Sequence, residues 1–112
     1  MKALVYAGNA LRTGDEIAQV VMEYAASLAG ASRADTVVIP VRTTSGTLGA
    51  ATLLLGPASQ IVAEDAPDEL EEIEDASVVA DLRERARAID SPSTAVVDGE
   101  PPGVAELDEF GL

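Results

Sequence analysis

The chain has 112 residues, a formal net charge of −13, and neither cysteine nor histidine. This length suits one domain that can bury a core of its own, and the missing side chains exclude disulfides, thiolate chemistry and histidine-based acid–base catalysis. Direct binding to nucleic acid or to an anionic membrane is disfavoured, because both require cationic patches.

The remaining composition bears on the source of the chain and on its cellular compartment. Arginine outnumbers lysine six to one and alanine is abundant, which is typical of GC-rich bacterial genomes. The first apolar run is too short for the core of a signal peptide, and no stretch approaches the roughly 18 residues that span a bilayer. We therefore expect a cytoplasmic bacterial protein.

The negative charge is concentrated in the second half of the chain. Residues 1–63 carry four basic and four acidic side chains, which cancel. Residues 64–112 carry sixteen acidic side chains against three arginines, so they hold the whole excess. Eight of these acids fall within residues 64–75, a run typical of a solvated surface or, alternatively, of a contact for a basic partner.

Hydrophobic patterning predicts a strand and then a helix near the N-terminus. Residues 2–7 form a short, partly β-branched apolar run that stops at Gly8. Thr13 and Glu16 fit a capping box, which predicts a helix over residues 14–30 with Thr13 as its N-cap. Apolar residues at helical spacing support this helix: Ile17, Val20, Val21, Tyr24 and Leu28.

The middle of the chain is typical of a β-hairpin over residues 36–55, with a polar turn at 43–46. Pro40 has no N–H to donate, so the first strand, 37–42, is expected at a sheet edge or with a bulge. Residues 60–63 are short and β-branched, which favours a strand over the first turns of a helix.

A second helical region covers residues 67–90, either as one helix or as two with a break near residues 75–77. A last short strand is expected at 94–97. The order β-α-β-β-(β)-α-β predicts an α+β two-layer sandwich, with a mainly antiparallel sheet and two helices. This would be a single domain over residues 1–98, followed by an acidic tail over 99–112 that begins with a Pro-Pro linker.

Two polar turns are candidates for binding a small ligand through hydroxyls and backbone amides. They supply the residues Thr43, Thr44, Ser45, Gly46, Ser59 and Gln60. Neither turn matches a phosphate-binding motif, and both are equally typical of ordinary turns. No catalytic residue emerges, because a serine nucleophile requires a base.

The acidic half supplies candidates for binding a protein partner. Glu69 and Glu72 lie in the acidic run, while Val104, Leu107 and Phe110 recur every three residues among the acids of the tail. Such an apolar, acidic segment resembles a docking peptide in composition, and the alternatives are a frayed terminus or packing on its own domain. The EF-hand pattern is absent, so we expect no dedicated metal site and no cofactor.

These features favour a non-enzymatic interaction or regulatory module that self-associates, with a dimer as the preferred state. The expected edge strand at 37–42 and the apolar tail are its motivation. An acidic decoy or inhibitor of a basic protein is one alternative. A small-ligand-binding domain or enzyme that uses the turns at 43–47 and 56–60 is the other.

Overall fold

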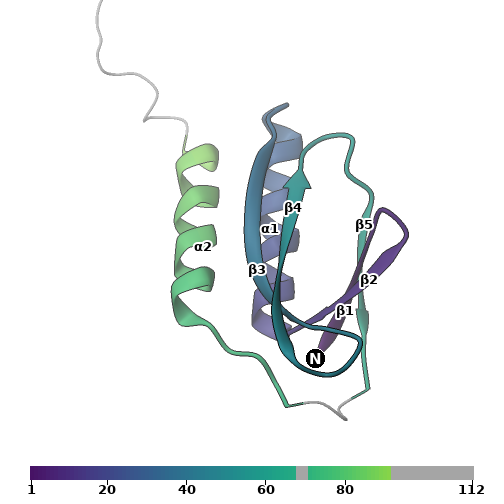
Figure 1. Cartoon of the computed structure of the whole chain (residues 1–112). Coiled ribbons are helices and arrows are strands. Elements are labelled where there is room, and N and C mark those ends of the chain that lie inside the picture. Colours follow the sequence, from purple (N-terminus) through teal and green to yellow (C-terminus); the bar gives the residue numbers. More distant parts are fainter. Residues whose placement is uncertain (68–70, 92–112) are drawn as a thin grey trace, which may run out of the picture.

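The computed structural model describes residues 1–67 and 71–91. Within these residues, five antiparallel strands form one sheet in the order β4-β3-β2-β1-β5, and two helices complete an α+β two-layer sandwich (Figure 1). The elements are β1 (Lys2–Tyr6), β2 (Asn9–Thr13), α1 (Asp15–Gly30), β3 (Asp35–Arg42), β4 (Leu48–Leu55), β5 (Ile61–Asp65) and α2 (Ala76–Asp90). The predicted fold class is confirmed.

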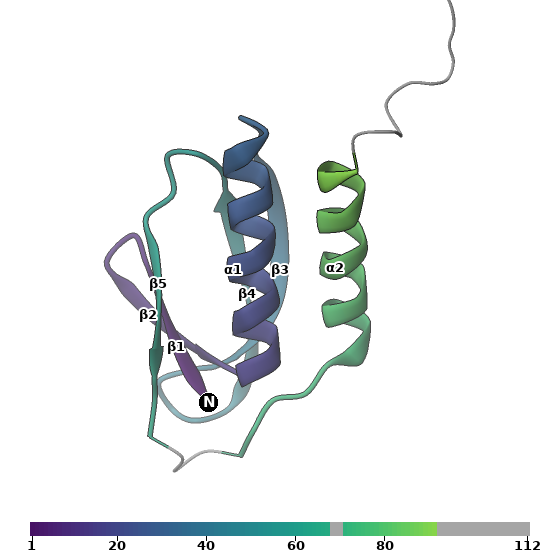
Figure 2. The ribbon, with the colours of Figure 1, turned by 180° about the vertical axis from the view of Figure 1, so that it is seen from behind.

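Helix α1 builds the core by packing its apolar stripe against one face of the sheet. All five residues whose spacing predicted this helix are buried. The sheet contributes alternate side chains, with Leu4 from β1, Val37, Ile39 and Val41 from β3, and Leu53 and Leu55 from β4. Helix α2 runs beside α1 and buries Val79 and Leu82 (Figures 1 and 2).

Strand β2 was not predicted, and the capping box at Thr13 is wrong. Ala7 and Gly8 have φ angles of 52° and 83°, so they form a two-residue turn that pairs Tyr6 with Asn9. The chain therefore returns along β1 as a strand that ends at Thr13. Gly14 is the N-cap of α1 and makes no side-chain cap bond, while the buried Thr13 hydroxyl donates 2.7 Å to the Pro40 carbonyl of β3.

Strand β3 lies in the interior of the strand order, so its prediction as an edge strand is wrong. It pairs with β4 over all eight of its residues, whereas β2 meets it only where Arg12 pairs with Arg42. The Pro40 carbonyl bonds Thr13 and therefore points away from β4. In an antiparallel strand the nitrogen and the carbonyl of one residue point to the same side. The Pro40 nitrogen therefore also points away from β4, to the side where β2 and β3 are not paired at this position, and no ladder bond is lost. The edge strands are β4 and β5.

The later elements settle two alternatives. Residues 61–65 are a strand, as favoured. The second helix begins at Ala76, after Asp75 as N-cap, whose carboxylate accepts a 3.2 Å bond from the Val78 N–H. The single helix over 67–90 is therefore wrong: the helix starts where a break was expected, near residues 75–77, and residues 71–75, predicted to be helical, are not. The strand predicted at 94–97 lies outside the described residues.

Candidate interaction surface

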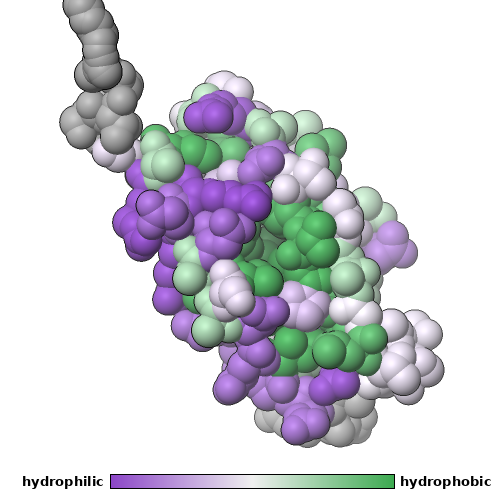
Figure 3. All heavy atoms as spheres, turned by 60° about the vertical axis from the view of Figure 1, so that its left-hand side comes forward, coloured by the Kyte–Doolittle hydropathy of each residue, from purple (hydrophilic) through white to green (hydrophobic). Residues whose placement is uncertain are grey.

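The outer sheet face is the face turned away from α1, and it carries large exposed aliphatic side chains. Side chains alternate along each strand, so the residues between the buried ones point to this face. Four large aliphatic side chains there are more than half exposed: Val38, Leu48, Leu54 and Val62. Figure 3, which brings the α2 side forward, shows apolar surface gathered in a band beside a hydrophilic region.

Two arginines lie side by side on this outer sheet face. Arg12 and Arg42 are register partners at the single pair that joins β2 to β3. The same row continues to Leu48 on one side, and to Ala3 and Glu64 on the other. Like charges directly opposite each other repel, so each arginine of this pair favours a nearby carboxylate.

The two arginines differ in their partners. Arg42 is mostly buried; it donates 3.4 Å to the carbonyls of Gly46 and Glu71, and its guanidinium lies 3.9 Å from the Glu71 carboxylate. Its Nε is buried without a hydrogen-bond partner among the described residues. Arg12 is exposed, and no side chain in the described part of the chain pairs with it. An incoming carboxylate would find Arg12 accessible.

The predicted ligand turn at 43–47 bonds mainly to itself. Thr43 Oγ1 lies 3.0 Å from the Ser45 hydroxyl and 2.8 Å from the Thr47 hydroxyl. The Gly46 N–H donates 2.8 Å to the Thr43 carbonyl, with Gly46 at a φ of 87° that favours glycine. Thr44 is exposed. The hydroxyls thus stabilise the hairpin turn, and a ligand would have to compete with these bonds.

The second predicted turn lines a pocket of about 430 Å³ at the other end of β4. Ser59 Oγ donates 3.0 Å to the Leu54 carbonyl and accepts a 3.0 Å bond from the Gly56 N–H, while Gln60 is exposed at the rim. Tyr6, which the sequence did not single out, donates 2.7 Å to the same Leu54 carbonyl and accepts from the Leu54 N–H. About 24 Å of strand β4 separates the two turns, so they do not form one site.

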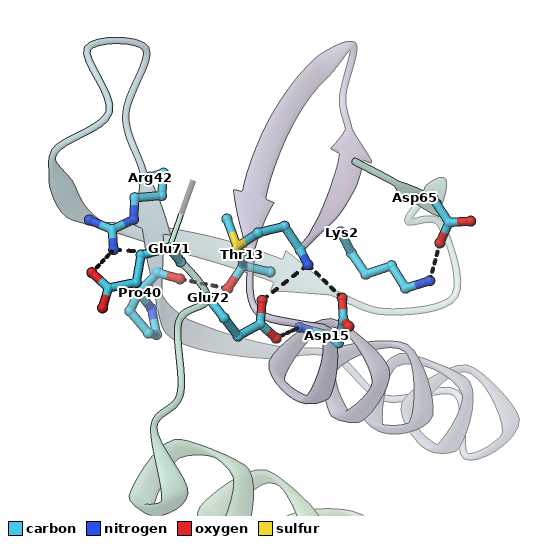
Figure 4. Close-up of polar contacts among 9 residues, drawn as sticks. Lys2, Thr13, Asp15, Pro40, Arg42, Asp65, Glu71 and Glu72 are labelled. Atoms are coloured by element: carbon cyan, nitrogen blue, oxygen red, sulfur yellow. Dashed lines mark hydrogen bonds and ion pairs between the residues drawn. The ribbon is translucent and has the colours of Figure 1, made fainter. Parts of the chain in front are cut away.

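The acidic run provides anchors for the chain's own N-terminus (Figure 4). The Met1 ammonium lies 3.0 Å from Glu72 Oε1 and 2.9 Å from Asp15 Oδ1, and Glu72 Oε2 accepts a 2.8 Å bond from the Asp15 N–H. These hydrogen bonds, first to Asp15 and then to Glu72, raise the pKa of the Met1 amine from 8.0 to about 10. Glu72, a predicted partner contact, therefore has a structural role.

Three further acids of the run have partners in the domain, whereas Glu64 and Glu74 are exposed without a partner among the described residues. Asp65 pairs with Lys2, Glu71 approaches Arg42, and Asp75 caps α2. Glu69 and the tail residues Val104, Leu107 and Phe110 lie outside the described residues. The described part of the acidic run is thus partly neutralised by the domain itself.

A separate polar network joins α2 to the rest of the domain. The Tyr24 hydroxyl donates 2.6 Å to Asp35 Oδ2, which also accepts a 3.1 Å bond from Arg85 of α2. The Tyr24 bond is the main cause that lowers the pKa of Asp35, with help from the Thr36 N–H and Arg85. Burial, followed by the bond to Asp35, raises the pKa of Tyr24. Each polar group has a structural partner, so this network is an anchor for α2.

Further comparisons add no function. Within residues 1–67 and 71–91, no three acidic side chains converge as metal ligands. Neither described helix has the length and hydropathy needed to cross a bilayer. No protein-family model, no curated protein and no solved structure matches the chain. The exposed aliphatic side chains of the outer sheet face are the feature of the described residues that bears on function.

Proposed function

We propose that this chain is a non-enzymatic interaction module that self-associates through its outer sheet face. The observation that carries this proposal is the set of four aliphatic side chains, each between 54% and 61% exposed, on one side of the sheet. Large exposed apolar side chains gathered on one face are typical of a protein–protein contact. Covering one half-exposed valine or leucine contributes about 1 kcal/mol.

The chemistry of the described residues supports a binding role over a catalytic one. The chain has no histidine or cysteine, and the hydroxyls of Ser59 and Thr43 are held in turns. The described groups with perturbed pKa values all join elements of the fold: Met1, Lys2, Tyr24, Asp35, Asp65 and Arg85. We keep the small-ligand and acidic-decoy hypotheses below this one, because no comparable exposed feature favours them.

We place the contact on the outer sheet face and not on a sheet edge at residues 37–42, where it was expected from the sequence. Strand β3 is not a terminal strand of the sheet: it pairs with β4 along its whole length and with β2 at Arg42. Val38 of β3, in contrast, is 58% exposed on the outer sheet face. A contact made there needs no change in strand pairing.

A charge placed in the apolar face tests the proposal. Val38→Glu is expected to weaken dimerisation by at least tenfold in sedimentation equilibrium, because burying an unpaired carboxylate is costly. Ala80→Glu adds the same charge at an exposed position of α2 and serves as the matched control, with an expected change below threefold. Urea unfolding of both variants checks that they fold. A parent chain that stays monomeric at all concentrations would overturn the proposal.

A further inference from the structure

We infer that the outer sheet face of one copy binds the acidic, apolar segment 104–110 of a second copy. This inference rests on the proposed self-association and names the part of the partner that completes it. In it, the carboxylates of the segment meet Arg12, and its apolar residues cover the aliphatic side chains of β3 and β4.

Charge is the first argument for this occupant. The outer sheet face presents Arg12, whose register partner Arg42 already lies 3.9 Å from the Glu71 carboxylate, so Arg12 is the cation left for an incoming anion. The segment carries Glu106, Asp108 and Glu109, and no basic residue follows Arg87 in the sequence. A carboxylate accepts well from a guanidinium, and Arg12 is exposed and has no partner in the described part of the chain.

Shape and hydrophobicity provide the second argument. Leu48 and Leu54 lie six positions apart on β4, which is about 20 Å of strand. Val104 and Phe110 are also six positions apart, and in extended form they span a similar distance. In extended form Val104 and Phe110 point to the same face and can cover Leu48 and Leu54, with Glu106 and Asp108 on that face between them.

Symmetry favours the tail over a direct contact between two outer sheet faces. A two-fold face-to-face dimer places the same patch on both copies, so it would bring the arginines of the two copies together wherever its axis passes through their row, and it would supply no carboxylate for Arg12. Val104 follows Ser91 by thirteen positions, which allows up to about 43 Å of extended chain. That length is sufficient to leave one domain and to reach a second.

Three variants of the full chain test the inference by sedimentation equilibrium. Replacing Val104, Leu107 and Phe110 together by serine is expected to weaken dimerisation by at least tenfold. Arg12→Glu is expected to do the same, and reversing Glu106, Asp108 and Glu109 to lysine in that variant should recover at least threefold of the loss. Glu100→Lys, an acid outside the segment, is the matched control and should change affinity by less than threefold.

Mixing copies distinguishes binding between chains from binding within one chain. A copy with the serine tail retains an intact face, and an Arg12→Glu copy retains an intact tail, so their mixture should dimerise more tightly than either alone. A dimer that Val38→Glu disrupts but the serine tail does not would overturn this inference and leave the proposed function standing. A parent monomer whose tail contacts its own face would overturn both.

Discussion

Thr13 illustrates how one buried hydroxyl replaces a missing ladder. It is fully buried, and its bond to the Pro40 carbonyl joins β2 to β3 where their backbones do not pair. Thr13→Val keeps the shape but leaves that carbonyl without its partner, so we expect a loss of about 1–2 kcal/mol in urea unfolding. Thr36→Val, at an exposed position of β3, should change stability by less than about 0.5 kcal/mol. Equal losses in the two variants would contradict this role.

The Met1 ammonium makes stability depend on alkaline pH. Its pKa is raised from 8.0 to about 10 in the folded chain. Because the folded-state pKa is the higher one, its ion pairs stabilise fully below about pH 8, and this stabilisation is lost as pH rises through about 10. Urea unfolding between pH 7.5 and 10 should therefore reveal a decline. A chain acetylated at the α-amino group should lack this decline, and equal slopes for the two chains would refute the assignment.

At the scale of elements, the sequence pattern predicted those helices and strands whose formation depends on neighbouring residues. The period of α1, the hairpin of β3 and β4 and the strand β5 all follow from nearby residues. Strand β2 escaped prediction because its turn uses Ala7 at a positive φ, where asparagine or glycine is the usual signal. The interior place of β3 depends on that missed strand, so the wrong edge assignment and the wrong cap at Thr13 have one cause.

The site was harder to predict than the fold, because it depends on register. Val38 and Leu54 are ordinary strand residues in the sequence, and only pairing places them on one uncovered face. Arg12 and Arg42 are thirty positions apart and meet through a single register pair. The hydroxyl turns gave visible signals, yet their side chains bond within the turns.

The start of α1 depends on a close approach of two segments. A Cβ on Gly14 would lie 1.8 Å from the Ile73 carbonyl oxygen, a backbone atom that cannot swing aside. Gly14→Ala should therefore cost about 2–3 kcal/mol or more in urea unfolding. Gly30→Ala, at the other end of the same helix, meets nothing within 4 Å and should be neutral or slightly stabilising. A mild effect at Gly14 would indicate that the segment before α2 moves freely.

For the whole molecule, burial divides the sheet into unequal parts. Strands β3 and β4 contribute five buried aliphatic residues to the core, whereas β5 has one half-buried residue, Ile61, and four exposed ones. The parts are joined by the Arg12–Arg42 pair, by the Thr13 bond to the Pro40 carbonyl and by the Tyr6 contact with Leu54. The outer sheet face crosses this junction, so the proposed partner would also hold the two parts together.

This division predicts a gradient of amide exchange across the sheet. Local opening requires less free energy where few apolar contacts are lost, so the β5 amides should exchange at least tenfold faster than those of Val37 and Leu53. Hydrogen exchange followed by NMR measures this difference directly, at a concentration below that of self-association.

Tyr6→Phe removes the hydroxyl that bonds both backbone groups of Leu54, so it should speed exchange of the Leu54 amide. If β5 exchanged as slowly as β3, the sheet would open as one cooperative unit, and a bound partner would add protection evenly. With the gradient, a partner on the outer sheet face should instead protect β5 most.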